Sequence, residues 1–457
     1  MKKPLLEKTI EMPAEVLDRG IESSQRLASH LPINGTETLK KARDYWYMLG
    51  PGLTTGASDD DPSGIATYSQ TGAQYGFSLL WTAALTFPLM AVIQEICARM
   101  GLVTGRGLAA NIRLHFGRKV LYISTLLLFA ANTFNIGADI GAMASAVRLV
   151  INLNSVLLVV ISTLFILLLQ IFTPYVKYAR YLKWLSLVLF AYIISAVLAH
   201  PDWHVILTKA IIPHVTWSKN ELLLLCAILG TTITPYLFFW QTSQEVEEKI
   251  ATGLVTAKER HGSNPEAMRK MRIDVWSGMF LSNMVMFFII AACASVLFSH
   301  GITNINTAAQ AALALKPFAG PATYYLFALG IIGMGLLAIP VLAGSSAYAI
   351  SESMGKRQGL SSKLKQGYAF YGVIIISMLV GLGLNFVGLN PIKALIYAAV
   401  ANGIVAPIIL VLIMLIARNR HIMGRWRVGR VSAFIGWLLV VLMALSGMAA
   451  LYSIFVA

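Results

Sequence analysis

The stretch that decides the fold of this chain is Gly50-Pro-Gly-Leu-Thr-Thr-Gly-Ala-Ser-Asp-Asp-Asp-Pro-Ser-Gly64. It runs directly into Ile65-Ala-Thr-Tyr68, so three consecutive aspartates stand within a segment that otherwise reads as a membrane helix. Proline removes a backbone donor and clashes with the preceding turn, while Gly and Ser lower helix propensity. We therefore predict a helix that is broken around Asp61–Gly64.

A second stretch of the same kind is Gly230-Thr-Thr-Ile-Thr-Pro-Tyr236, which continues into Leu-Phe-Phe-Trp. A proline again follows a run of small and β-branched residues, and it predicts unwinding at Thr231–Thr234. One proline kink is usually structural. Two interrupted spans that lie five spans apart are typical of two inverted five-helix repeats, whose unwound backbone binds ions near the bilayer midplane.

The composition supports a membrane protein with many spans. Hydrophobic residues make up 57% of the 457 residues and charged residues 12%, whereas soluble chains carry roughly 25% charged residues. A soluble fold cannot cover so much apolar surface. The net charge of +15 does not indicate a nucleic-acid partner, because Lys and Arg collect in the cytoplasmic loops of such proteins. The lipid bilayer is the partner that the composition predicts.

Hydropathy predicts eleven spans, since a bilayer core needs about 20 apolar residues per helix. The expected fold class is therefore an all-α polytopic membrane protein. We expect spans near 46–73, 77–103, 119–148, 154–173, 182–200, 221–243, 275–299, 321–350, 368–388, 391–417 and 431–456. The predicted units are an N-terminal arm at 1–44, a first repeat at 45–200, a second repeat at 221–417 and a peripheral helix at 431–456.

The basic residues predict the orientation. If the N-terminus is cytoplasmic, nearly all Lys and Arg residues fall on the cytoplasmic side, as the positive-inside rule requires. The exceptions are Arg148, Lys209, Lys219, Lys316 and Lys393. We expect a multi-pass protein of a bacterial inner (plasma) membrane with a cytoplasmic N-terminal arm.

Few polar or ionisable residues lie inside the spans, and each is a functional candidate because its burial in the membrane is costly. Asp61, with Asp59 and Asp60 beside it, is the first candidate. Asp139 in the third span serves either an ion pathway or an interhelical hydrogen bond. Gln241 and Glu245 lie four residues apart and therefore share one helix face.

No enzymatic activity is expected from this sequence. All eight histidines lie in loops, tails or helix ends, which disfavours a histidine proton relay within the membrane. There is no phosphate-binding loop, HExxH zinc motif or other catalytic arrangement. We expect no resident cofactor and no obligate protein partner, and a small ion is the expected substrate.

The chain resembles the NRAMP family of divalent-metal transporters. The resemblance begins at Leu49-Gly-Pro-Gly52, and Asp61-Pro-Ser-Gly64 matches the family's Asp-Pro-Gly-Asn motif at two of four positions. In the sixth span the family's Met-Pro-His aligns with Thr234-Pro-Tyr236, and Arg418-Asn-Arg-His-Ile-Met-Gly424 is also similar. This resemblance implies the LeuT-type fold, with helices one to five and six to ten as inverted repeats and an eleventh, peripheral helix.

The resemblance also implies a metal site with Asp61 as its charged ligand. The family's asparagine is replaced by Gly64, which leaves more room for an ion that keeps its water, and its methionine is replaced by Thr234. A thioether favours soft ions, so this replacement hardens the site. Mg²⁺ uses one or two carboxylates plus water. The altered site resembles that of NRAMP-related magnesium transporters, so we expect Mg²⁺ first and Mn²⁺ next.

The same resemblance bears on whether transport is coupled to protons. The family's proton-pathway histidines align near Tyr236 and Gln241, and its acidic residue on the third helix aligns with Asp139, so proton coupling is not implied. Hydroxyl side chains enrich both breaks, which favours a carrier whose substrate is not a metal; they are Thr54, Thr55, Ser58, Ser63, Thr231, Thr232 and Thr234. Beside Asp61, we expect Ser63, Gly64, Thr231 and Thr234 to bind the substrate or ion.

Two other functions fit the sequence. The positive ends of the broken helices favour a bicarbonate or small-anion carrier, with Asp61 holding a coupling Na⁺ or H⁺. A receptor or scaffold without transport is the third class, and the two related breaks argue against it.

Overall fold

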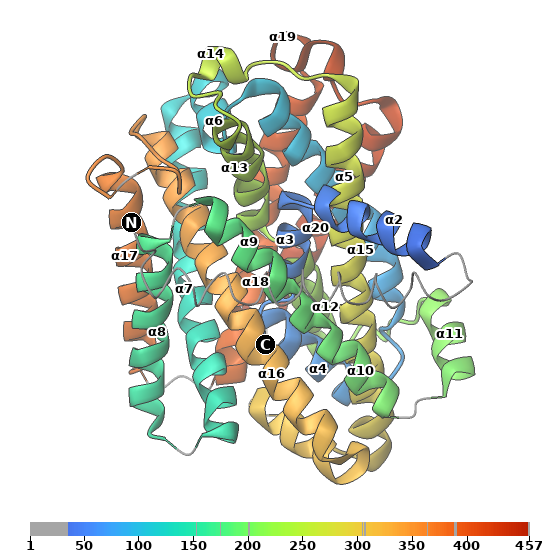
Figure 1. The fold of residues 1–457 in the computed structure, drawn as a ribbon. Helices are drawn as coiled ribbons and strands as arrows, with labels where there is room; N and C mark the ends of the chain where they lie inside the picture. The colour runs from blue at the N-terminus through green and yellow to red at the C-terminus, as the bar shows by residue number, and fades with distance from the viewer. Residues whose placement is uncertain are drawn as a thin grey trace. The chain divides into compact units, whose positions relative to one another are not determined.

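The structure is a computed structural model, and it describes residues 35–151, 153–173, 175–199, 202–303, 305, 308–362, 364–387 and 391–455. Among these residues the only regular elements are helices (Figure 1), as the sequence predicted. The chain divides into two compact units at Leu49 and Gly50. The predicted arm at 1–44 lies mostly outside the described residues, and the first unit contributes α2 (Gly35–Met48).

The second unit holds every other helix. In chain order these are α3 (Pro51–Asp59), α4 (Pro62–Tyr75), α5 (Trp81–Thr104), α6 (Leu108–His115), α7 (Arg118–Val150), α8 (Ser155–Phe172), α9 (Tyr175–Leu185), α10 (Phe190–Leu198), α11 (Trp203–Ile211), α12 (Lys219–Thr232), α13 (Pro235–Ala251), α14 (Ala257–Arg260), α15 (Pro265–Val296), α16 (Ala308–Ser353), α17 (Tyr368–Leu384), α18 (Pro391–Arg418), α19 (Arg420–Met423) and α20 (Arg430–Phe455).

The helices account for the eleven predicted spans. Within the described residues, nine helical segments are long and apolar enough to cross a membrane, counting α9 with α10 and α12 with α13 as one segment each. The shorter apolar helix α17 and the broken pair α3–α4 supply the other two. Helix α8 exposes Leu157, Ile161, Leu164 and Leu168, which is expected of a helix that faces lipid.

Two predicted boundaries were wrong by several residues. The fifth span begins at Tyr175 rather than near 182, and the seventh at Pro265 rather than near 275, because each helix continues through polar, basic first turns. The eighth span begins at Gly320, as predicted near 321, and a kink there, with a φ of 84°, separates it from the helical segment that starts at Ala308.

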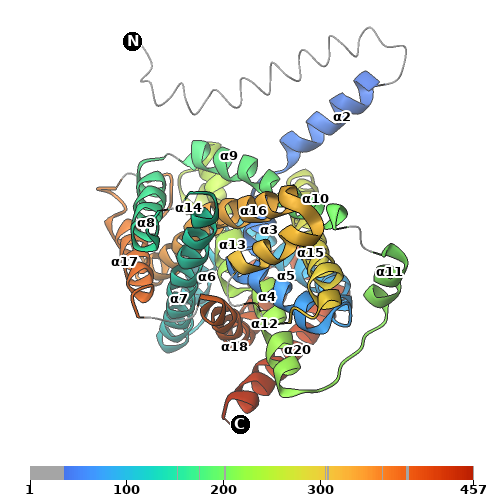
Figure 2. The same cartoon turned by 90° about the horizontal axis from the view of Figure 1, so that it is seen from below.

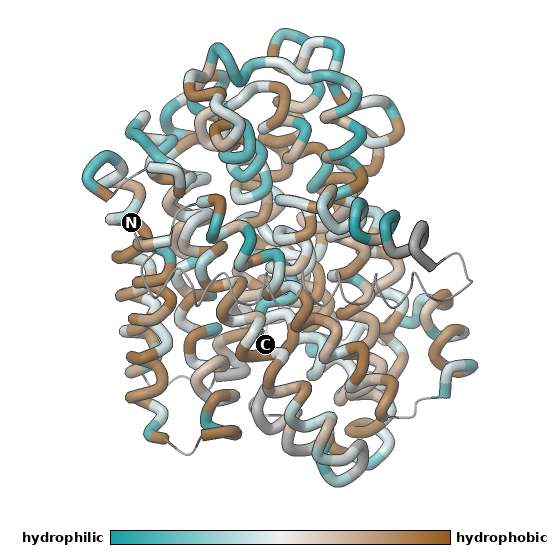
Figure 3. Tube along the Cα trace, in the orientation of Figure 1, coloured by the Kyte–Doolittle hydropathy of each residue, from teal (hydrophilic) through white to brown (hydrophobic). Residues whose placement is uncertain are grey.

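Polar connections gather at one end of this unit. Figure 1 places α6, α14 and α19 together at the top, and Figure 3 shows hydrophilic tube there and hydrophobic tube along the helices below. The connections that carry these helices are among those that the positive-inside rule assigned to the cytoplasm. The alternation of spans therefore agrees with the predicted topology.

Both predicted breaks occur: the first comprises Asp60 and Asp61, so it begins one residue before the predicted Asp61–Gly64, and the second is narrower than the predicted Thr231–Thr234. Helix α3 ends at Asp59 and α4 begins at Pro62; α12 ends at Thr232 and α13 begins at Pro235. In each case proline occupies the first position of the new helix, where its missing N–H is not needed. Ser63, Gly64 and Thr231 therefore lie in helical turns that flank the breaks.

Helix α3 is seated on α15 by direct backbone contact. A Cβ atom on Gly56 would lie 2.2 Å from the carbonyl oxygen of Gly278, and one on Gly278 would lie 2.1 Å from that of Gly52. The Asp274 carboxylate accepts hydrogen bonds from the backbone N–H groups of Gly50, Gly52 and Leu53, at 2.7 to 3.0 Å. These contacts cap α3 and position the first break.

Candidate ion-binding site

The two breaks meet in the interior of the protein. The Ser63 and Thr231 hydroxyl oxygens lie 3.4 Å apart. The Tyr236 hydroxyl donates to the carbonyl oxygen of Ser58 at 2.7 Å, and the Tyr236 carbonyl accepts from the Ser345 hydroxyl. The predicted juxtaposition of the two interrupted helices is therefore present, with hydroxyl groups from both sides.

Asp61 is the acidic residue at this meeting point. It caps α4: its Oδ1 accepts from the Gly64 backbone N–H at 2.7 Å and from the Ser63 hydroxyl at 2.6 Å. Its Oδ2 accepts from the Asn135 side chain at 2.8 Å. Asp61 has 0% exposure, so these donors and the positive end of α4 offset the cost of burying its charge.

Helix α7 contributes two polar residues to this site. Asn135 binds Asp61 directly, and its Oδ1 accepts no hydrogen bond from the described residues. Asp139 lies one turn further, close enough to Asp61 for their charges to interact. Its carboxylate faces the Ser63 backbone N–H of α4, although neither oxygen meets full hydrogen-bond geometry with a described residue. An ion pathway and an interhelical contact therefore both stay predictions for Asp139.

The second break offers an unused ligand. Thr234 is 1% exposed and precedes the first turn of α13, but its hydroxyl neither caps that helix nor bonds to another described residue. No group of three or more His, Cys, Asp or Glu side chains is placed to hold a metal in the described chain. A cation at the breaks would thus be bound by the Asp61 carboxylate, hydroxyls and water, all of which are hard oxygen ligands.

The surroundings of Gly64 are closely packed. A Cβ atom there would lie 3.1 Å from the Thr231 hydroxyl oxygen and 3.3 Å from the Asp59 carbonyl oxygen. A side chain at this position would therefore require Thr231 to shift, and the room for a hydrated ion that the sequence predicted stays a prediction.

Other predicted residues lie away from this meeting point. The Gln241 amide donates to Glu245 at 3.0 Å, as their spacing predicted, but Gln241 lies more than one turn and Glu245 more than two turns into α13. Asp59 accepts from Ser282 of α15 at 2.9 Å. The same hydroxyl faces Asp60, although neither carboxylate oxygen of Asp60 meets full hydrogen-bond geometry with a described residue. These two aspartates lie at the same break as Asp61, but they do not share its hydrogen-bond donors.

Sequence reasoning missed Asn135, Ser282 and Asp274. Asn135 had a detectable signal, since it lies four residues before Asp139 on the same helix face. Ser282 and Asp274 follow Asp59 and the start of α3 by more than 200 residues, and no local pattern links them.

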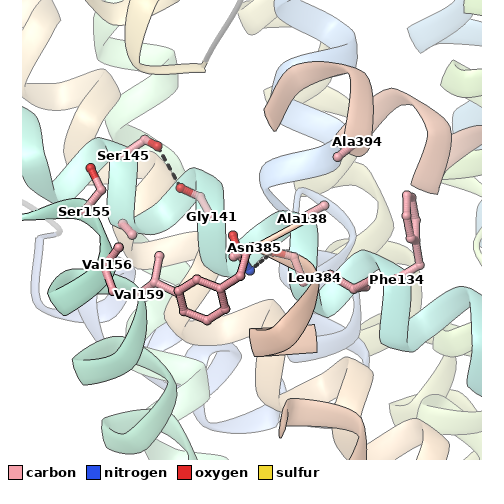
Figure 4. A pocket seen from close by; sticks show the side chains of 13 residues that line it. Phe134, Ala138, Gly141, Ser145, Ser155, Val156, Val159, Leu384, Asn385 and Ala394 are labelled. Carbon is pink, nitrogen blue, oxygen red and sulfur yellow. Dashed lines mark hydrogen bonds between the residues drawn. The ribbon is translucent and has the colours of Figure 1, made fainter. Parts of the chain in front are cut away.

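A cavity of about 250 Å³ lies elsewhere, between α7, α8, α17 and α18. Figure 4 shows its lining, with Phe134, Ala138 and Gly141 on α7 and Asn385 at the end of α17. The Asn385 amide donates to the Gly137 carbonyl at 2.9 Å. Asp61 does not line this cavity, so the meeting point of the breaks is the better candidate for an ion site.

Comparisons with known proteins agree with this geometry. A family model described as natural resistance-associated macrophage protein-like (Nramp) matches residues 52–453. The chain is 25% identical to a divalent metal cation transporter MntH of Deinococcus radiodurans, over 91% of this chain and 92% of that protein. It is 26% identical to the MntH of Pectobacterium carotovorum, over 86% and 91% of the two chains.

Solved structures share the fold. A manganese transporter of Eremococcus coleocola superposes with a TM-score of 0.71 at 20% identity, covering 90% of this chain and 87% of that one. Mhp1, a nucleobase-cation-symport-1 family transporter, gives a TM-score of 0.55 at 19% identity, covering 89% and 91%. The predicted LeuT-type, all-helical membrane fold is confirmed.

Proposed function

This chain belongs to the Nramp family, a family of transporters rather than enzymes, and on that premise we propose that it carries a hard divalent cation across the membrane. Mg²⁺ is the first candidate and Mn²⁺ the second. The transport mode is alternating access, in which the bundle rocks around a fixed site at the breaks.

One observation carries this proposal: Asp61 lies where the two broken helices meet, and the neighbouring side chains offer oxygen ligands. Asp61 supplies the negative charge, and Ser63, Thr231 and Thr234 supply hydroxyls. The relatives named MntH are divalent metal cation transporters, which supports a divalent ion as the substrate class.

The preference for Mg²⁺ rests on Thr234. At the position where the family resemblance implies a methionine, this chain has a buried hydroxyl without a partner among the described residues. Mg²⁺ accepts oxygen ligands and binds thioethers poorly, whereas Mn²⁺ tolerates a softer ligand. The site therefore fits the branch of NRAMP-related magnesium transporters.

Uptake into liposomes tests the proposal. Purified protein is reconstituted, and uptake of Mg²⁺, Mn²⁺, Ca²⁺ and bicarbonate is measured against empty liposomes. We expect uptake of Mg²⁺ and, more weakly, of Mn²⁺. Accumulation of bicarbonate without movement of any divalent cation would replace this proposal with the anion carrier, in which Asp61 holds a coupling Na⁺ or H⁺.

A further inference from the structure

Asp59 and Asp60 form an acidic pair that the Asp61 site does not use. Both have 0% exposure. Asp59 Oδ2 accepts from Ser282, and the same hydroxyl faces the Asp60 carboxylate. Asp59 Oδ1 and both carboxylate oxygens of Asp60 meet full hydrogen-bond geometry with no described residue. The ion pairs of the described chain involve neither residue. Two buried carboxylates thus lack a compensating positive charge from the described protein.

The helix ends make this imbalance larger. Asp61 caps the start of α4, where the helix dipole favours a negative charge. Asp59 is the last residue of α3 and Asp60 follows as its C-cap, where the dipole disfavours a negative charge. The same break therefore holds one stabilised carboxylate and two destabilised ones, which attract a cation from outside the protein.

Asp59 and Asp60 lie on a different side of the break from the residue of α7 that donates a hydrogen bond to Asp61. Asp61 bonds to Asn135 of α7, whereas Asp59 bonds to Ser282 of α15. Figure 2 shows α7 on one side of α3 and α4, and α10 and α15 on the other. A cation held by the pair would therefore be distinct from one held by Asp61.

Buried tyrosine hydroxyls provide an independent sign of a ligand. Tyr192 of α10 is 1% exposed, its hydroxyl has no hydrogen-bond partner among the described residues, and it lies within electrostatic range of Asp60. A Cβ atom on Gly330 would lie 2.5 Å from this hydroxyl, so the glycine makes room for it. The Tyr68 hydroxyl is also buried without such a partner and lies within electrostatic range of all three aspartates.

We propose that Asp59, Asp60 and Ser282 form a second site for a hard cation, separate from the Asp61 site. Two carboxylates and a hydroxyl form a set of oxygen ligands that suits Na⁺ or Mg²⁺ and offers nothing to a soft metal. Bound there, the cation neutralises charge at the end of α3.

Cation binding in the absence of the first site tests this proposal. The full chain is purified in detergent with Asp61→Asn, and binding of Mg²⁺ by calorimetry and of radioactive Na⁺ by equilibrium dialysis is measured. We expect one of the two ions to bind, and the ion that binds identifies the occupant. Adding Asp60→Asn should weaken that binding by about tenfold or more, because a charged ligand is lost.

The matched control is Asp44→Asn in the same background, since Asp44 is an exposed aspartate of α2 and should not affect the binding. If the Asp60 variant does not fold, Ser282→Ala in the Asp61→Asn protein gives the same test and should also weaken binding. The proposal is overturned if neither ion binds once Asp61 is replaced, or if the Asp60 and Ser282 variants bind as tightly as their parent. Because the readout is binding, a failure of Mg²⁺ transport would not affect this result.

Discussion

Asp61 has two roles: it caps α4, and we propose that it is the charged ligand of the transported ion. Its carboxylate caps α4 and accepts three hydrogen bonds, so part of its role is structural. The same carboxylate is the charge nearest the hydroxyls of both breaks. An ion that enters must compete with Ser63, Gly64 and Asn135 for its oxygens, and these donors are positioned to retain the carboxylate's orientation when the ion leaves.

Replacing Asp61 by alanine separates the cation and anion functions. Asp61→Ala should abolish Mg²⁺ uptake into liposomes, because the only charged ligand proposed for the transport site is lost. The loss of the cap should lower stability by about 0.5–2 kcal/mol, so the protein should remain folded by size-exclusion chromatography. Uptake of bicarbonate that persists but no longer depends on Na⁺ or pH would instead support the anion carrier.

The selectivity of the site should depend on Thr234. Thr234→Met together with Gly64→Asn should raise binding of Mn²⁺ or Cd²⁺ relative to Mg²⁺, because a thioether is a soft ligand. The Gly64 change requires Thr231 to move, since a Cβ atom would lie 3.1 Å from its hydroxyl oxygen. Thr234→Met alone is therefore the cleaner variant. Equal relative affinities in both variants and the parent would show that these side chains do not contact the ion.

Among the elements, the short helix α3 depends most on its neighbour. Its start is capped by Asp274 and its glycine face lies against the backbone of α15, so its position is determined by α15. Because Asp59 and Asp60 end this helix, the geometry of the break follows from the same packing. Any movement of α3 relative to α15 would shift the positions of both the Asp59 and the Asp60 carboxylates.

Gly56→Ala tests this dependence. Its Cβ atom would lie 2.2 Å from the Gly278 carbonyl oxygen, which is backbone and cannot rotate away. We expect a loss of about 1–3 kcal/mol or more, measured as a lower thermal unfolding temperature in detergent. Gly372→Ala in α17 is the matched control: nothing lies within 4 Å of its Cβ position, so it should be neutral or stabilising. Equal effects of the two substitutions would show that α3 is not tightly seated.

The connections at the two ends of the membrane helices differ in their content of basic residues. The connections that carry α6, α14 and α19 share one end, and the loop between α7 and α8 lies at the other (Figure 1). The basic residues concentrate in the first group, as the positive-inside rule requires of a cytoplasmic face. We therefore predict that this end faces the cytoplasm.

Cysteine labelling in intact cells measures that orientation. Lys258→Cys lies in α14, at the predicted cytoplasmic end, and Leu153→Cys lies in the loop between α7 and α8 at the opposite end. Both positions are exposed. The three native cysteines are buried, which keeps their reaction low. A membrane-impermeant maleimide should label residue 153 in intact cells and residue 258 only after lysis. The reverse pattern would invert the predicted topology.

Local sequence was enough to predict the existence of the spans, the two breaks and the acidic residue at the first break. These features depend on local properties: apolar length sets a span, and proline after small residues interrupts a helix wherever the chain folds. It also located Asp61, because an aspartate inside a membrane segment requires a function to justify its burial.

The tertiary structure alone decided which groups surround each aspartate. Ser282 follows Asp59 by more than 200 residues, and Thr231 fills the space at Gly64 from the opposite repeat. Such contacts arise when whole helices pack, and side chains that are distant in sequence carry no local sign of them. For the same reason three adjacent aspartates looked alike in the sequence, whereas in the fold one caps a helix and two end another.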